Sequence, residues 1–163
     1  MSVLSFGVRL LKTGFVKLMQ KTSNLRPYRE YLAELATFPV GTVGREVAGF
    51  MRRHNFEFIP RFSDHDLKHV LLGYGVSVQD ELRMQAFMLG NGNYSPACVL
   101  FLLPALLMPS LWKTLLHDFR EGRKSLCIVN FHIEDVAHMP LGKMQHFIYS
   151  NQPINPGKLR LRK

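Results

Sequence analysis

The feature that most constrains the fold is the spacing of apolar residues, which recur at three and four positions along most of the chain. This periodicity is typical of amphipathic helices. The segments are separated by Gly, Pro and Asn rather than by the two-residue turns of β-hairpins, so the sequence predicts a mainly α protein. The expected helices span residues 2–21, 26–37, 43–54, 64–73, 78–89, 96–121 with a kink, and 141–149, with boundaries uncertain by about 2 to 4 residues, and short extended segments are expected at Phe56 to Ile59 and at Leu126 to Phe131.

The length and composition fit one folded domain. The chain has 163 residues, of which 47% are hydrophobic and 20% are charged, as in ordinary soluble proteins. No internal repeat or low-complexity linker is visible, so we expect a single domain over residues 1–163. Cys98 and Cys127 form no C-x-x-C pair, so the sequence indicates neither a disulfide framework nor a thiolate zinc knuckle, and a reducing, intracellular compartment is favoured.

The net charge of +9 predicts attraction to an anionic partner, such as nucleic acid, a phospholipid surface or a phosphorylated ligand. Cations gather at both ends, in a predicted amphipathic helix at residues 2–21 and in a basic tail at residues 156–163. The first segment suits either an ordinary helix packed on the core or a helix lying on a membrane. No nucleic-acid recognition motif accompanies the charge, so a nucleic-acid partner is not expected.

The most apolar stretch runs from Ala97 to Met108. It is shorter than the ~18 to 20 residues that span a bilayer, and Pro104 interrupts it, so a transmembrane helix is not predicted. The favoured interpretation is a buried central helix. A wall of a lipid-binding tunnel, or a face that contacts a membrane, remains open.

Two helix starts are unusually well marked, because Ser63 and Ser77 are each followed three residues later by an acid. Gly73-Tyr74-Gly75 lies between the two helices, and the run from Gly90 to Asn93 ends the second, since Gly and Asn tolerate the left-handed conformation. The pattern predicts a tight helical hairpin.

Polar side chains on this hairpin predict a metal site. A helix turns ~100° per residue, so Asp66 lies ~100° and His69 ~40° from His65, within one sector. Glu81 lies in the first turn of the next helix, which the short connection brings back. Two imidazoles and two carboxylates suit zinc, manganese, iron or cobalt and leave room for a substrate oxygen. The alternative is a solvated polar face near a helix start.

The run His65-Asp66-Leu67-Lys68-His69, followed by eleven residues and Glu81, reproduces the HDxxH-x11-E signature of the coenzyme Q biosynthesis protein 4 family. Outside this motif, the segment from Pro39 to Arg45 resembles the family's G-[ST]-x-G-R segment, and Glu121-Gly122-Arg123 and Met139-Pro140-Leu141 also agree. The resemblance covers residues 38–148.

The resemblance implies a divalent metal, usually described as zinc, held by His65, Asp66, His69 and Glu81. It implies oxidative decarboxylation at ring carbon 1 of a polyprenylated 4-hydroxybenzoate-derived precursor of ubiquinone, in which a hydroxyl replaces the carboxylate. It also implies a homodimer attached peripherally to the inner face of a membrane, either the bacterial cytoplasmic membrane or the matrix side of the mitochondrial inner membrane. Other enzymes of quinone biosynthesis would be partners, and a scaffold role would accompany catalysis.

Two other functions remain open. The first is a non-catalytic lipid-binding or scaffold protein of a prenyl-lipid pathway, in which the metal only holds the hairpin. The second is an HD-type metal phosphohydrolase, which would need roles for His54 and Asp118 and leaves His69 and Glu81 unexplained.

Overall fold

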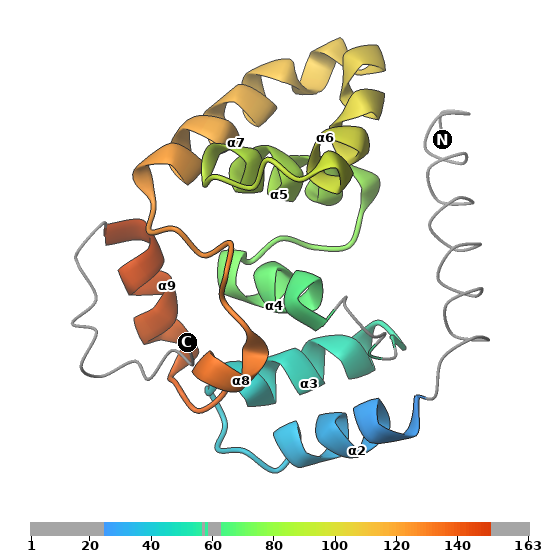
Figure 1. Ribbon diagram of the computed structural model, residues 1–163, viewed down its shortest axis with the longest axis vertical. Helices are drawn as coiled ribbons and strands as arrows, with labels where there is room; N and C mark the ends of the chain where they lie inside the picture. Colours follow the sequence, from blue (N-terminus) through green and yellow to red (C-terminus); the bar gives the residue numbers. More distant parts are fainter. Residues whose placement is uncertain (1–24, 57, 59–62, 151–163) are drawn as a thin grey trace. The chain divides into compact units, whose positions relative to one another are not determined.

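The computed structural model describes residues 25–56, 58 and 63–150 (Figure 1). The predicted mainly α fold is confirmed, and in these ranges the one β interaction is an isolated antiparallel bridge between Thr42 and Pro140. Contacts divide the chain into two compact units. Among the described residues, unit 1 contains Tyr74–Asn130 and the chain from Phe147 onward, and unit 2 contains the chain up to Gly73 and Phe131–His146. The predicted helix at residues 2–21 and the basic tail at 156–163 lie outside the described residues.

Unit 2 is built from four helices and the first part of a fifth. α3 begins after Thr42, whose side-chain oxygen accepts a hydrogen bond from the backbone N–H of Arg45. Gly44 is buried beside Leu35, where an added Cβ would come within 2.9 Å of a side-chain carbon. This close packing explains a glycine inside a helix. The elements are α2 (Arg26–Leu35), α3 (Val43–Arg53), α4 (Ser63–Leu72), α8 (Ile133–Val136) and the start of α9 (Leu141–Ser150).

Unit 1 contains α5 (Val78–Gly90), α6 (Pro96–Leu102), the short 3-10 helices η1 (Leu103–Leu107) and η2 (Pro109–Leu111), and α7 (Trp112–Lys124). The predicted start of α5 is confirmed, because Ser77 and Asp80 form a complete capping box. Ser63 is the first residue of α4, and the chain before it lies outside the described residues, so its predicted cap stays a prediction.

α5 and α7 pack backbone to backbone (Figure 1). A Cβ added at Gly90 would collide with the carbonyl of Phe119, and one added at Gly122 would collide with the carbonyl of Phe87. Asn91 continues this contact, because its side-chain amide donates to the carbonyls of Gly122 and Leu126, at 3.1 and 2.9 Å. Its side-chain oxygen also accepts from the backbone N–H of Ile128 at 2.8 Å.

Two predicted elements differ in the structure. The kinked helix at residues 96–121 is instead α6, η1, η2 and α7, because Pro104 and Pro109 interrupt the α-helical hydrogen bonds. The short extended segment expected at Leu126 to Phe131 has a turn at residues 129 and 130, and its backbone groups bond to the Asn91 side chain and to the carbonyl of Ile148. The segment from Phe56 to Ile59 is described only in part.

The expected buried central helix at Ala97 to Met108 is wrong. Cys98 and Ala105 are its buried residues, and the larger side chains around them face outward. We call these side chains the apolar surface, and their exposed fractions range from 40% to 68%. The apolar surface consists of Val99, Leu100, Phe101, Leu103, Leu106, Leu107, Trp112 and Leu116.

Among the described residues, no single helix is long and apolar enough to cross a membrane. The segments Pro96–Leu107 and Pro109–Lys124 reach that length and composition only as a pair, and the pair is bent by 111°.

Candidate metal centre

α4 brings two of the predicted ligands together. His65 and His69 lie one helical turn apart, and their Nε2 atoms approach to 3.2 Å. The rings stand nearly perpendicular, with centroids 4.9 Å apart. His69 is buried and His65 is partly buried. The helix therefore directs two imidazole nitrogens to one point in a poorly hydrated place.

The separation of these nitrogens fits a shared metal ion. With Zn–N bonds of about 2.05 Å and tetrahedral angles, two nitrogen ligands lie about 3.3 Å apart. Without a metal, the same separation suits a hydrogen bond in which one neutral ring donates to the other. The separation of the two nitrogens therefore suits either state, and the pair lies within reach of one shared cation.

Packing within unit 2 holds His69 in place. The ring of Phe50, from α3, stacks on the imidazole with centroids 5.5 Å apart and planes inclined by 21°. Phe50 is itself buried. An apolar ring on one face of an imidazole limits its rotation, which favours one ligand geometry.

The two predicted carboxylate ligands lie on different helices. Asp66 is partly buried on the first turns of α4. Glu81 lies in the first turn of α5 and is only 6% exposed. A carboxylate this deeply buried needs hydrogen bonds, a cation or a metal to offset its lost hydration. Glu81 belongs to unit 1 and the histidines to unit 2, so the four-residue ligand set stays a prediction.

Two polar contacts that the sequence did not indicate join α4 to the segment before α8. The buried Lys68 donates from Nζ to the carbonyl of Phe131 at 2.7 Å. Burial lowers the pKa of Lys68 to about 8, and the nearby Asp64 carboxylate partly offsets this shift. Asp64 itself lies 2.8 Å from Nδ1 of His132. Nothing in the helical pattern marks Lys68, which lies at a buried position between Leu67 and His69.

A second polar cluster lies in unit 1. The Arg83 guanidinium donates to both carboxylate oxygens of Asp118, at 2.8 and 3.2 Å. The same guanidinium lies over the ring of Tyr74, 5.3 Å from its centroid. Burial raises the pKa of Tyr74, and the Asp118 charge adds to the shift. Because Arg83 occupies both oxygens of Asp118, the structure lends no support to the metal-ligand role that an HD-type phosphohydrolase would require.

Comparison with known proteins shows a similar fold and no family assignment. No family model matches the chain, and no curated protein matches it. Among solved structures, it is similar to a putative ubiquinone biosynthesis protein from Nostoc punctiforme, with a TM-score of 0.58 and 22% sequence identity. The alignment covers 84% of this chain and 80% of the Nostoc chain. At this identity the similarity shows that the two proteins share a fold.

Proposed function

We propose that this protein is a metal-dependent enzyme of ubiquinone biosynthesis. The observation that carries the proposal is the His65 and His69 pair, whose nitrogens lie at the separation of two ligands on one ion. The pair belongs to the HDxxH-x11-E signature. The name of the Nostoc protein with the same fold points to the same pathway.

The proposed ligands are His65, Asp66, His69 and Glu81, with zinc as the first candidate and manganese, iron or cobalt as alternatives. A cation bound there would hold the carboxylate or phenolate of the aromatic ring and stabilise the charge that develops as carbon dioxide leaves. The protein supplies a buried carboxylate at Glu81 and a restrained imidazole at His69.

The proposed reaction takes place at ring carbon 1 of a polyprenylated 4-hydroxybenzoate-derived substrate. The bond to the carboxylate carbon breaks, carbon dioxide leaves and a hydroxyl takes its place, which removes two electrons from the substrate. We name dioxygen as the oxidant: one water and one dioxygen enter, and carbon dioxide and hydrogen peroxide leave. Zinc has no accessible redox couple, so with zinc the electrons pass directly from the electron-rich phenolate to dioxygen.

We also propose peripheral attachment to the inner face of an anionic membrane, where a prenylated substrate resides. The apolar surface supports this, because large exposed patches of this kind mark interaction sites. From Leu82 to His117 the sequence contains no acidic residue, so nothing in that stretch repels anionic lipid. A homodimer and contacts with other enzymes of the pathway belong to the same proposal.

The apolar surface also favours a second candidate, a non-catalytic lipid-binding or scaffold protein. In that function the metal would only hold the fold together, and its removal would unfold the protein. The two candidates therefore differ in what metal loss does to the helices.

The test is to purify the protein gently from the membranes of its host and to measure bound metal and co-purified lipid in one sample by mass spectrometry. We expect one metal per chain and a carboxylated prenyl-aromatic lipid. His69→Ala should lose the metal and keep its helical circular dichroism. The matched control is His117→Ala, whose side chain is 71% exposed on α7 and which should keep the metal.

Stoichiometric metal in His69→Ala would contradict the ligand assignment. Loss of metal together with loss of helix would favour the scaffold function over the enzyme. Metal without any quinone-related lipid would contradict the proposed substrate, and recovery entirely in the soluble fraction would contradict membrane attachment.

A further inference from the structure

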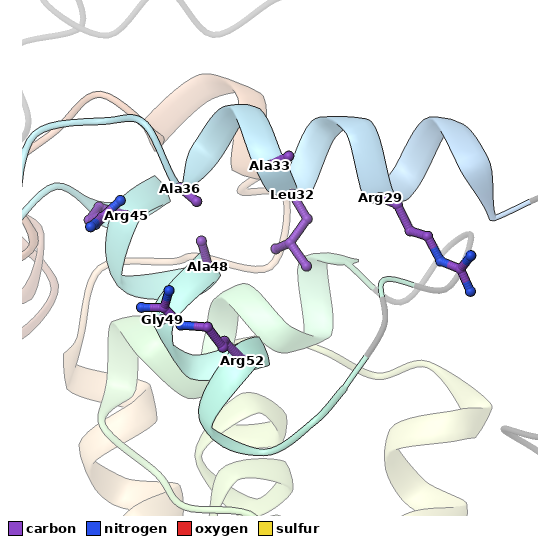
Figure 2. A pocket seen from close by; sticks show the side chains of 8 residues that line it. All are labelled: Arg29, Leu32, Ala33, Ala36, Arg45, Ala48, Gly49 and Arg52. Carbon is purple, nitrogen blue, oxygen red and sulfur yellow. The ribbon is translucent and has the colours of Figure 1, made fainter.

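A cleft of about 370 Å³ lies between α2 and α3 in unit 2 (Figure 2). One wall belongs to α2 and is apolar apart from Arg29, and the other belongs to α3 and carries Arg45 and Arg52. We call it the arginine cleft. Its lining consists of Arg29, Leu32, Ala33, Ala36, Arg45, Ala48, Gly49 and Arg52.

The α3 wall is a stripe of residues on one helical face. Arg45, Gly49 and Arg52 are spaced by four and three positions, so they follow one another along the helix. Gly49 has no side chain, which leaves the helix surface open between the two arginines. A Cβ placed there would lie 3.2 Å from Nη1 of Arg53, so a third guanidinium borders the same place.

No acidic residue lines the arginine cleft. Arg45 and Arg52 form no ion pair with any residue in the described part of the chain. Arg83 in unit 1, in contrast, is paired with Asp118. Figure 2 shows the Arg29 side chain extending away from Arg45 and Arg52, so a ligand bound over Gly49 would meet Arg45 and Arg52 rather than Arg29.

We propose that the arginine cleft binds a phosphate monoester with a short apolar stem. The phosphate would lie over Gly49 between Arg45 and Arg52, because planar guanidinium groups bind phosphate through paired hydrogen bonds and two of them balance a dianion. The stem would lie along Leu32, Ala33 and Ala36. The volume is at the low end of ligand sites, which suits a head group and a few carbons rather than a long chain.

This proposal is independent of the proposed metal site, since the cleft is formed by α2 and α3 and the histidine pair lies on α4. The phosphate monoester has two sources, a soluble metabolite or the head group of a lipid such as phosphatidate. The shared chemistry is the dianionic phosphate, and the experiment separates the sources.

The test measures binding of inorganic phosphate and butyl phosphate by calorimetry, and of phosphatidylcholine vesicles with and without phosphatidate by sedimentation. We expect saturable binding of butyl phosphate. Arg45→Gln with Arg52→Gln should weaken it at least about tenfold, because charge-assisted hydrogen bonds are lost. The matched control, Lys113→Gln with Arg120→Gln on exposed positions of α7, removes the same charge and should leave binding unchanged.

Binding of phosphatidate vesicles but not of butyl phosphate, with the same dependence on Arg45 and Arg52, would assign the head group to a lipid. Inorganic phosphate bound as tightly as butyl phosphate would overturn the apolar stem. No saturable binding of any probe, or equal weakening by both double variants, would overturn the site. Arg52 is exposed, so Arg52→Gln alone gives the same test should the double variant fail to fold.

Discussion

Two helix pairs in this protein use small residues at their contacts and reach opposite results. In unit 1, glycines on α5 and α7 let the two helix backbones come into direct contact. In unit 2, α2 and α3 also present small residues, but a cleft remains between them. The small residue alone therefore does not determine how closely two helices pack.

The difference lies in what stands beside and opposite the small residues. Gly90 and Gly122 each meet a carbonyl of the opposite helix, and the buried Asn91 satisfies the backbone groups next to the crossing. Gly49 is flanked by the long, charged side chains of Arg45 and Arg52. Burying those guanidinium groups without anionic partners would cost more free energy than the packing gains.

The largest expected effect comes from Gly122→Ala. The new Cβ would collide with the carbonyl of Phe87, so the helices must separate, and we expect a loss of about 3 kcal/mol or more in the free energy of unfolding. Urea unfolding followed by circular dichroism measures this. Gly142→Ala is the control, because nothing lies within 4 Å of its added Cβ. Equal stability of the two variants would show that the backbones do not touch.

A smaller loss is expected from Asn91→Ala. The substitution removes two buried hydrogen bonds and one partly buried one, and it leaves the N–H of Ile128 and two carbonyls to find new partners. We expect about 2 to 3 kcal/mol of destabilisation. Hydrogen exchange at the Ile128 amide should accelerate in step with the urea result. An unchanged exchange rate would mean that the Asn91 side chain does not hold this segment.

The smallest effect, and one of opposite sign, is expected from Gly49→Ala. The added methyl meets only the flexible end of Arg53, and alanine favours the helix more than glycine does. We expect stabilisation of about 0.5 to 1 kcal/mol in the same urea experiment. A destabilisation as large as that of Gly122→Ala would show that α3 has no more room for an added Cβ at Gly49 than α7 has at Gly122.

Local patterns predicted the elements that depend on local chemistry. α5 begins where its capping box requires, and α3 begins at the expected residue, because caps and apolar spacing act within a few residues. The close backbone approach of α5 and α7 at Gly90 and Gly122 was not predicted, since it joins segments about 30 positions apart in the sequence. The conformation of the segment from Leu126 to Phe131 was not predicted either, because it depends on a hydrogen bond from Ile128 to the distant side chain of Asn91.

In the candidate site too, a contact within one helix was predicted and contacts between distant segments were not. The convergence of His65 and His69 follows from a spacing of four on one helix, which the sequence displays directly. Two other contacts join residues that are distant in the sequence: Arg83 pairs with Asp118, and Lys68 donates to the Phe131 carbonyl. No local pattern predicts such contacts. The exposure of the apolar surface was not predicted either, because the hydrophobicity of a segment does not determine which other elements cover it.

The apolar surface also has a consequence for the life of a newly made chain. A folded protein that keeps eight large apolar side chains in water will associate with whatever similar surface it meets first. Self-aggregation therefore competes with any other binding by this surface, and the outcome depends on protein concentration as well as on stability. We expect a variant that folds as well as the parent but reaches a higher concentration to accumulate as insoluble material.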